Sequence, residues 1–212
     1  MKTIDATDLR DETLKEALSP AALAIKRGGL VVLPTTTYYG LAADALNPDA
    51  VHRVFLAKKR DPRKPLIVLV DSFEMMKPLV REVPPELKDL EWRFGSRGLT
   101  YVLPDSGRLP AELTAGTGTV GVRVDRHEVV QEVLGLVGGP ITAPSANVES
   151  GAPPKTADEA VAALRDWVDA AVRWWPARAD APSTLVDLSG DEPRILREGT
   201  VPGADVLAAL AR

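Results

Sequence analysis

The sequence predicts an α/β fold: a single domain in which an open, twisted, mixed sheet is flanked by helices. One observation is that continuous apolar runs, such as Leu66-Ile67-Val68-Leu69-Val70, have the character of strands covered on both faces. A second is that such runs alternate with segments of helical periodicity along all 212 residues. A third is that the chain contains no internal repeat, low-complexity segment or linker that would divide it. We therefore expect residues 1–212 to form one domain.

The composition favours a soluble globular protein, with 45% hydrophobic and 26% charged residues. No stretch approaches the roughly 18 apolar residues that a membrane span requires. The first residues, MKTIDATDLRDE, are polar and acidic and do not resemble a signal peptide. Cysteine is absent, which excludes disulfides, thiolate metal sites and a thiol nucleophile. We expect a cytoplasmic location and no membrane partner.

In the first third of the chain, residues 8–27 are predicted to form a helix, or two helices broken near Pro20. A buried strand over 30–33 follows and leads into a hydroxyl-rich turn over 35–40. The next helix begins at Asn47-Pro48, where Asn is a good N-cap and Pro suits the first helical position. Pro62 ends that segment.

The remaining elements continue the alternation. Strands are predicted at 66–70, 99–103, 120–124, 141–143, 184–188 and 194–196, the last two as neighbours. Helices are predicted at 73–80, 85–94, 127–136 and 157–174, with a terminal helix after Pro202-Gly203. Asp125 is expected to cap the helix over 127–136, and the capping box from Thr156 to Glu159 starts the helix over 157–174.

A dense cationic cluster follows the helix that begins at Asn47. Its members, all within seven residues, are Lys58, Lys59, Arg60, Arg63 and Lys64. In an extended exit from the helix, Lys58 and Arg60 point the same way and could hold one anion, such as a phosphate. The alternative is that these cations offset the helix dipole, at about 0.3–1 kcal/mol each. That alternative accounts for one or two of them, and five would repel one another without a bound anion.

Polar side chains in three other places also suggest a ligand site. Ser145 and Asn147 follow a buried strand, a usual place for a ligand in open α/β sheets, although a turn stabilised by these side chains is the common alternative. Arg123 lies inside an apolar strand and Arg197 directly after one, where an Arg must be paired or contact a ligand. Ser183 directly precedes the strand predicted over 184–188, which is expected to pair with the strand that Arg197 follows.

Several familiar sites are excluded. Residues 116–121 match G-x-G-x-x-G, but a strand follows instead of a helix, so we reject a Rossmann dinucleotide site. No P-loop pattern occurs. Only two histidines are present, which gives poor support to a zinc site or a His-based triad. Mg²⁺ that arrives with a polyphosphate and keeps its waters is compatible with this chain, and no residue is assigned to hold it.

Six motifs carry a resemblance to a known family. PTTTYYGL, KKRDPRKPLIVLV, TVGVRV, APSAN, PSTLVDLSG and ILREG occur in the order and spacing of the YrdC-like family, over about residues 20–200. The resemblance implies an open α/β sheet around a concave cationic site. It also implies the reaction of the family's threonylcarbamoyl-adenylate synthases, which join L-threonine, bicarbonate and ATP into L-threonylcarbamoyl-AMP and pyrophosphate. The product would pass to a separate tRNA threonylcarbamoyl transferase that modifies the adenosine at position 37.

The resemblance also implies roles for individual residues. Threonine-binding positions would be Thr35, Arg123, Thr142, Ala143 and Ser183. The set around the nucleotide phosphates, which would carry catalysis, would be Lys58, Arg60, Ser145 and Asn147. Further ATP-binding positions would be Pro62, Thr119, Pro153 and Arg197.

Three departures from the family pattern affect loops. Thr36 stands where an acidic residue is usual, Ser96-Arg97-Gly98 replaces Pro-Gly-Pro, and the segment after Asn147 is one residue longer than usual. Two alternatives to the synthase stay open: a carbamoyl-adenylate-forming paralogue, and a non-catalytic RNA-binding module. The net charge of −4 argues against a broad RNA-coating surface, so we expect any tRNA binding to be weak and salt-sensitive.

Overall fold

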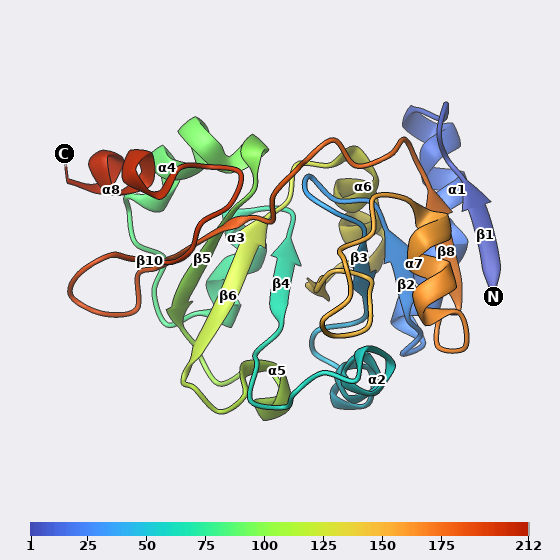
Figure 1. Ribbon diagram of the computed structural model, residues 1–212, viewed down its shortest axis with the longest axis horizontal. Coiled ribbons are helices and arrows are strands. Elements are labelled where there is room, and N and C mark those ends of the chain that lie inside the picture. The colour runs from blue at the N-terminus through green and yellow to red at the C-terminus, as the bar shows by residue number, and fades with distance from the viewer. Residues whose placement is uncertain (212) are drawn as a thin grey trace.

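The computed structural model describes residues 1–211, whose strands form two sheets side by side with helices around them (Figure 1). The first sheet has the order β1-β8-β2-β3 and the second has the order β10-β9-β5-β6-β4-β7. The strands are β1 (Lys2–Asp5), β2 (Val31–Leu33), β3 (Gly40–Ala42), β4 (Ile67–Val70), β5 (Leu99–Pro104), β6 (Thr119–Val124), β7 (Ile141–Thr142), β8 (Ala170–Arg173), β9 (Thr184–Asp187) and β10 (Arg194–Arg197). Both sheets mix parallel and antiparallel pairs. The predicted α/β class is confirmed, with the strands divided over two sheets instead of one.

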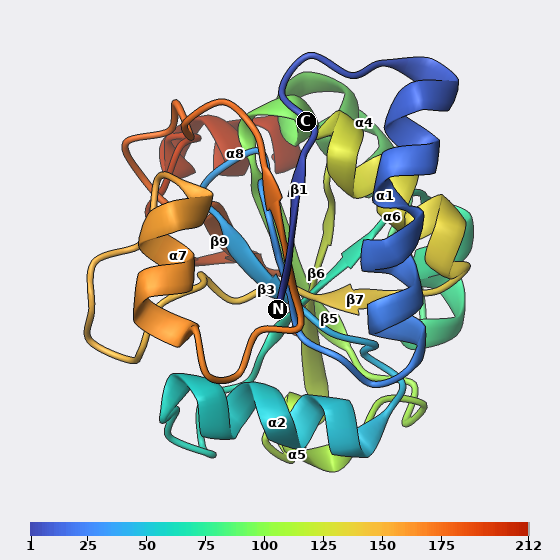
Figure 2. The ribbon, with the colours of Figure 1, turned by 90° about the vertical axis from the view of Figure 1, so that its right-hand side faces the viewer.

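The helices lie on both sides of the sheets (Figure 2). They are α1 (Asp11–Lys26), α2 (Pro48–Lys58), α3 (Phe73–Met76), α4 (Leu87–Phe94), α5 (Ala111–Thr114), α6 (Glu128–Val137), α7 (Ala157–Leu164) and α8 (Gly203–Leu210), with short 3₁₀ turns at Lys77–Leu79 and Gly95–Arg97. In Figure 2, α1 and α6 lie together on one side and α7 lies on the other. None of the helices in residues 1–211 is long and apolar enough to cross a membrane.

The side chains of residues 30–33, in and just before β2, point alternately to the two faces of the first sheet and are all apolar. Val31 and Leu33 join the apolar cluster formed with α1 and α6, whereas Leu30 and Val32 join the larger cluster with α2 and α7. Because successive strand residues point to opposite faces, a central strand covered on both faces must be apolar throughout. This is why the run over 30–33 was recognisable in the sequence.

Around β5, β6 and β9 part of one face of the second sheet is left open, whereas Leu69 of β4 and Ile141 of β7 join the cluster with α6. In β6, Val120, Val122 and Val124 point into the core, so Thr119, Gly121 and Arg123 point to the opposite face. Within residues 1–211, no helix packs against that opposite face at Gly121, whose neighbours there come from other strands of the same sheet. The open face forms the floor of the cavities described below.

The two sheets meet at a seam between β3 and β7. Isolated bridges join Gly40 to Ser145 and Asp44 to Ile141. Between them, the Thr142 hydroxyl donates to the Leu41 carbonyl oxygen and accepts from the Ala43 amide, both at 3.0 Å. The seam places the loop after β7 directly beside the turn between β2 and β3.

Three strands and one short helix were not predicted, and one helix was predicted too long. The helix expected over 157–174 ends at Leu164, and residues 170–173 form β8, which pairs in parallel with β1 and β2. The Ala-rich stretch suits a helix by intrinsic propensity, but pairing on both sides and burial of Ala171 and Val172 favour a strand. Strands β1 and β3 and helix α5 are too short to give a periodic signal.

The structure decides between the two alternatives at Pro20 and corrects one local prediction. Residues 11–26 form one helix that continues through Pro20, so the chain does not break there. His127, not Asp125, is the N-cap of α6, and its side chain accepts from the Val129 amide. Asp125 instead accepts the His127 amide and pairs with Arg123, as described below.

Candidate active site

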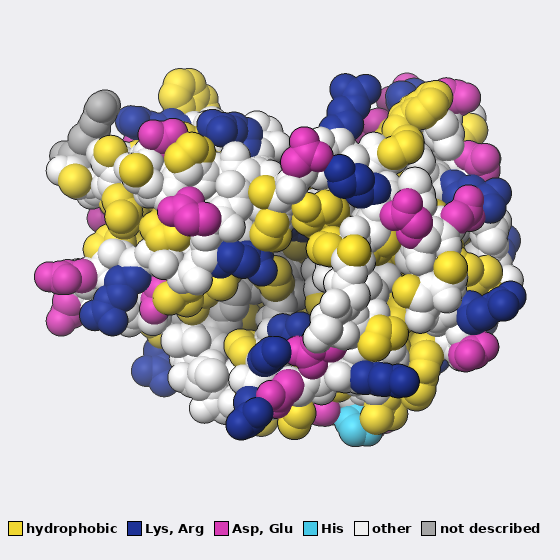
Figure 3. All heavy atoms as spheres, in the orientation of Figure 1, with side chains coloured by type: hydrophobic (Ala, Val, Ile, Leu, Met, Phe, Trp, Pro, Cys, Tyr) yellow, Lys and Arg dark blue, Asp and Glu magenta, His cyan; other side chains and the backbone are white. Residues whose placement is uncertain are grey.

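A cavity of about 240 Å³ lies where the seam meets the open face of the second sheet. We call it the central cavity, and its lining residues are Thr35, Thr37, Tyr38, Tyr39, Gly40, Ile67, Arg123, Ala143, Ser145, Pro153, Pro182, Ser183 and Arg197. They come from both sheets and from three loops that are far apart in the sequence. Figure 3 shows a hollow between the two halves of the molecule, with side chains of both charges at its borders. The cavity is therefore open to solvent, and the charged side chains of its lining are Arg123 and Arg197.

The turn between β2 and β3 forms one wall of the central cavity. The Thr35 hydroxyl donates to the Tyr38 carbonyl oxygen at 2.7 Å and accepts from the Thr37 amide at 3.2 Å. Thr35 and Thr37 are both buried, and their hydroxyl oxygens are 3.3 Å apart. These local bonds fix a non-helical turn and leave hydroxyls at its surface.

Arg123 is the buried cation of this wall. Its Nη2 pairs with Asp125 at 2.7 Å, and its Nη1 donates to the Thr37 hydroxyl at 3.1 Å. The side chain is only 4% exposed, and its Nε has no partner among residues 1–211. The guanidinium thus lines the cavity in a fixed orientation with donor capacity left over.

Arg197 lies on the opposite side of the cavity and is oriented by Ser183. Its Nε and Nη2 donate to the Ser183 carbonyl oxygen at 3.1 and 2.9 Å, and Nη2 also reaches the Ser183 hydroxyl at 3.0 Å. That hydroxyl accepts from Thr100 at 2.8 Å. Partial burial, followed by the nearby charges of Arg123 and Arg60, lowers the pKa of Arg197. The guanidinium groups around the cavity therefore repel one another, which favours a bound anion.

Lys58 holds the loop after β7 in place. It is 2% exposed, and its ammonium donates to the carbonyl oxygens of Ser145 and Asn147, the latter at 2.6 Å. Burial, followed by the positive charge of Arg60, lowers the pKa of Lys58 to about 8. The Asn147 amide group bonds within its own loop, to the carbonyl oxygens of Val148 and Gly151.

Three other cations of the cluster, Arg60, Arg63 and Lys64, have protein partners. Arg63 pairs with Asp61 at 2.7 Å, and Lys64 pairs with Glu149 at 2.5 Å. Arg60 donates through Nε and Nη2 to the backbone carbonyl oxygens of Lys64 and Pro65, and burial lowers its pKa. The carboxylates of Asp61 and Glu149, which were not considered from the sequence, therefore partly offset the repulsion among these cations.

A second cavity of about 250 Å³ shares Ile67 with the central cavity. We call it the side cavity, and it is lined by Pro65, Leu66, Ile67, Val102, Thr117, Thr119, Gly121, Leu185 and Leu196. Most of these side chains are apolar, in contrast to the Arg-lined central cavity. Together the two cavities offer one compartment for an anion and one for an apolar, flat group.

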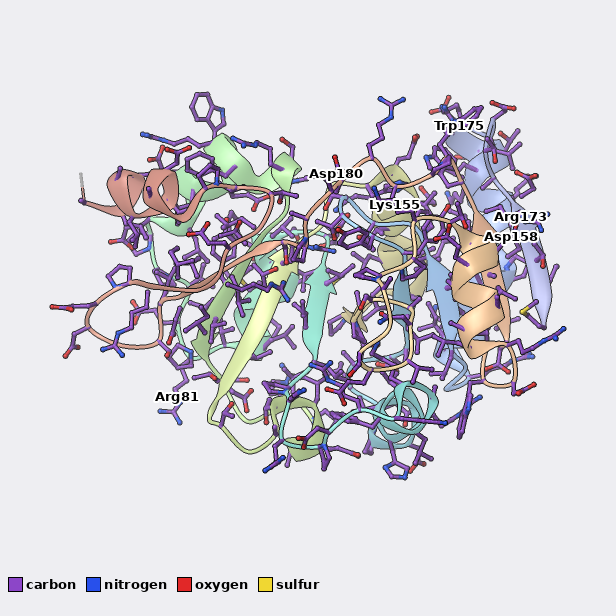
Figure 4. The ribbon with its side chains drawn as sticks, viewed as in Figure 1. Arg81, Lys155, Asp158, Arg173, Trp175 and Asp180 are labelled. Atoms are coloured by element: carbon purple, nitrogen blue, oxygen red, sulfur yellow. The ribbon has the colours of Figure 1, made fainter. Side chains whose placement is uncertain are left out.

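Two loops that border the central cavity are tied together at the surface. Pro153 lies in the loop after β7, and Pro182 lies in the segment over 174–183 that crosses from the first sheet to the second. Lys155 and Asp180 join these loops through an ion pair at 2.8 Å (Figure 4). The buried Tyr39 hydroxyl, which contacts the Trp174 amide and carbonyl oxygen at 3.0 Å, fixes the start of the crossing segment.

Seven of the residues expected from the sequence line the central cavity: Thr35, Arg123, Ala143, Ser145, Pro153, Ser183 and Arg197. Lys58 bonds to the backbone of the loop that carries Ser145, Asn147 belongs to that loop without lining the cavity, and the Thr142 hydroxyl is engaged in the seam. Thr119 lines the side cavity, and Pro62 is exposed beyond α2. The roles given to all these residues stay predictions.

Sequence reasoning missed Thr37, Tyr38, Pro182 and Asp125. Thr37 follows Thr35 at i+2 within the same hydroxyl run, and that spacing was the available signal. Asp125 follows Arg123 at i+2 in the same way, but an Asp before a helix is first taken for a cap. Arg97, at one of the three departures, donates to the Thr200 carbonyl oxygen at 3.2 Å and does not line the central cavity.

The residues present do not form a protein cage for Mg²⁺. Within residues 1–211 no three His, Cys, Asp or Glu side chains gather as metal ligands. Asp125 is already occupied by Arg123 and Thr36. We therefore assign no chemical step to a metal held by this chain.

Comparison with known proteins identifies the family of this chain. The family model Sua5_yciO_yrdC, described as "Telomere recombination", matches residues 23–199. This chain belongs to that family. The resemblance stated from the sequence is thereby confirmed.

Two curated relatives carry the name threonylcarbamoyl-AMP synthase. The relative from Pyrococcus abyssi is 38% identical over 86% of this chain, and the chain spans 54% of that relative's length. The relative from Thiobacillus denitrificans is 34% identical over 82% of this chain, which spans 93% of its length. The chain is thus similar both to a longer archaeal protein and to a bacterial protein of comparable length.

A solved structure supports the same family. The crystal structure of P. abyssi Sua5 complexed with L-threonine matches 99% of this chain and 61% of that protein's chain. The TM-score is 0.93 at 34% sequence identity. The arrangement of the sheets and of the cavity-bearing face is therefore that of the family.

Proposed function

We propose that this protein is a threonylcarbamoyl-AMP synthase, which joins L-threonine, bicarbonate and ATP and releases pyrophosphate. The observation that carries the proposal is the central cavity, where Arg123 and Arg197 face a common space together with the turn that carries Thr35. Such a cavity offers fixed positive charge for carboxylate and phosphate and hydroxyls for a small polar amino acid. The names of the relatives support the same reaction.

The amino acid would lie against the turn between β2 and β3. Arg123 would bind its carboxylate, and the hydroxyls of Thr35 and Ser183 would contact its side-chain hydroxyl. Ala143, which lines the cavity, would contact the methyl group. Because the Thr142 hydroxyl already makes two bonds in the seam, we assign Thr142 the task of placing Ala143.

The nucleotide would span both cavities. Its phosphates would lie near Arg197 and Ser145, with Arg60 and Lys58 supplying positive charge and Asn147 shaping the loop. Its base would lie in the side cavity, where Thr119 and the apolar side chains could hold a flat ring. Pro153, at the cavity wall, would contact the nucleotide through its backbone, and Pro62 would lie at the outer edge.

The proposed reaction requires no protein nucleophile. Bicarbonate loses water to give CO₂, and the threonine amine adds to this CO₂ and releases a proton to solvent, which forms a carbamate. One carbamate oxygen then attacks the α-phosphorus of ATP while the bond to pyrophosphate breaks. The chain contributes by holding the carbamate in line and by placing positive charge at the phosphate oxygens. Arg197, rigidly held by Ser183, is suited to this second task.

The low pKa of Lys58 leads to a pH dependence. Because that pKa is about 8, the ammonium loses its charge as the pH rises through this value. ATP affinity should therefore fall above pH about 8, by up to about tenfold per pH unit, as one linked proton requires. Titration of ATP binding by calorimetry would measure this, with Lys58→Arg as the comparison because Arg stays charged. Identical pH profiles in the two proteins would contradict the assignment.

A pyrophosphate-release assay tests the proposed function. With ATP and bicarbonate saturating, L-threonine should stimulate release and its omission should abolish it. Serine lacks a methyl worth about 1–3 kcal/mol and should be a poor substrate, while valine leaves buried polar groups unpaired and should be rejected more strongly. If no amino acid stimulates release, the carbamoyl-adenylate-forming paralogue becomes the better interpretation. Binding of tRNA with no ATP turnover would favour the RNA-binding module.

The wider setting is part of the proposal. The product would pass to a tRNA threonylcarbamoyl transferase, with Mg²⁺ entering as a companion of ATP. Direct contact with tRNA would be weak, since the net charge is −4. Residues 1–212 would act as one domain in the cytoplasm.

A further inference from the structure

Asp125 is a fully buried carboxylate at which several donors converge. It pairs with Arg123 Nη2 at 2.7 Å and accepts the His127 amide at 2.9 Å. From the first sheet, the Thr36 hydroxyl donates to Oδ2 at 3.0 Å and the Thr36 amide to Oδ1 at 3.3 Å. A carboxylate that accepts this many bonds holds its donors in a single geometry.

These contacts connect the two parts of the cavity wall. Arg123 belongs to β6 of the second sheet, and Thr36 belongs to the turn after β2 of the first. Thr35 and Thr37 line the central cavity with Arg123, but Asp125 does not. Whatever Asp125 contributes to ligand binding, it contributes through Arg123 and through this turn.

The charge on Asp125 is required by Arg123. A buried guanidinium without a counter-charge is strongly unfavourable, and no other acidic side chain pairs with Arg123 within residues 1–211. Position 36, on the other side of this contact, carries the uncharged Thr. The Thr36 hydroxyl lies 3.0 Å from Asp125, so a carboxylate at position 36 would approach the same place from the other sheet.

We propose that Asp125 is the positioning residue of the amino-acid end of the cavity, and that it supplies the negative charge at this contact between Arg123 and the turn after β2. This inference rests on the proposed function for the identity of the ligand. Asp125 touches no reacting atom. Its carboxylate sets the orientation of Arg123 and the conformation of the turn over 35–37, and these bind the amino acid.

The test moves the carboxylate from position 125 to position 36. Asp125→Asn should raise the KM for threonine by about 10²-fold, the usual effect of a misplaced binding group, while the KM for ATP changes less than about threefold. Adding Thr36→Asp to Asp125→Asn should recover most of this loss. Thr36→Asp alone should impair threonine binding, because two carboxylates would then share one buried site. If Asp125 had only a structural role, Thr36→Asp would not lower the KM for threonine in the Asp125→Asn protein and raise it in the wild-type protein.

A matched control is available in Asp158→Asn. Asp158 pairs with Arg173 at 2.6 Å, a similar length, but this pair is exposed and lies outside both cavities (Figure 4). The control should leave both KM values unchanged. Equal rises in the KM values for threonine and ATP in Asp125→Asn, or a double variant no better than Asp125→Asn, would overturn the proposal.

Two further measurements keep the outcomes distinct. If Asp125→Asn does not fold, the double variant should still fold and bind threonine by calorimetry, and its failure to do so would reject the proposal. If wild-type protein binds no threonine, the proposed function fails, and the ¹⁵N spectrum of the Arg123 guanidinium then decides on Asp125. Sharp signals in wild type and in the double variant, with broadening in Asp125→Asn, are expected, and unchanged signals in all three would reject the positioning role.

Discussion

Replacing Arg123 by Met is expected to lower threonine-dependent pyrophosphate release by about 10²–10³-fold, as loss of a fixed charged donor at a reaction site does. The same change should lower the free energy of unfolding by about 3–5 kcal/mol, because Asp125 would remain buried without its partner. Pyrophosphate release and urea unfolding would measure the two effects separately. Wild-type turnover in a folded Arg123→Met protein would show that the amino acid binds elsewhere.

A double replacement separates stability from function at this position. Arg123→Met combined with Asp125→Asn removes both charges, and replacing both members of a buried pair is often close to neutral. The side-chain amide oxygen that Asp125→Asn introduces could still accept the bond that the Thr36 hydroxyl now donates to Asp125. The double variant should therefore regain most of the lost stability and none of the lost turnover. Recovery of turnover together with stability would mean that Arg123 serves only the fold.

The largest expected effect on the nucleotide comes from Gly121. A Cβ built there would meet Ile67, Thr100 and Leu185 at 3.6, 3.6 and 4.0 Å, which are ordinary contact distances. Gly121→Ala should therefore fold and bind ATP, whereas Gly121→Leu should fill the side cavity. A base that buries about 100 Å² of apolar surface there gains roughly 2.5 kcal/mol, so its exclusion should weaken ATP binding by about 10²-fold.

Calorimetric titration of ATP into the two Gly121 variants checks this prediction. Threonine affinity, measured alone, should stay near the wild-type value in both, because Gly121 is not part of the central cavity. Equal ATP affinity in the Ala and Leu variants would place the base outside the side cavity.

The fold was predictable wherever an element has enough length to show its period. The β4 run over 67–70 and the α2 cap at Asn47 were recognisable because burial and capping leave local marks in the sequence. Strand β8 was not, because its Ala-rich stretch favours a helix until β1 and β2 pair with it. Pairing between strands more than a hundred residues apart leaves no local pattern.

The candidate site, like the fold, was predictable where the signal is local in the sequence and not where it depends on residues far apart in the chain. The i, i+2 spacing drew attention to Lys58 and Ser145, and a charge inside an apolar strand drew attention to Arg123; Ser145 and Arg123 line the central cavity. The partners of these side chains could not be predicted, since they lie across the fold. Lys58 bonds to a loop 87 and 89 residues away, and Arg123 bonds to Thr37 at a separation of 86 residues.

The seam between β3 and β7 has a consequence for the dynamics of the protein. Apolar clusters join the two sheets, but the hydrogen-bonded pairing across the seam consists of isolated bridges, a short run of backbone bonds and the Thr142 hydroxyl instead of a continuous strand ladder. Because interrupted pairing opens locally at lower free energy than a continuous ladder, the Ala43 and Thr142 amides should exchange with solvent faster than those inside either sheet. A ligand that touches both the turn after β2 and the open face would bridge the sheets and slow that exchange. Occupancy of the cavity could thus be followed at backbone amides that the ligand never contacts.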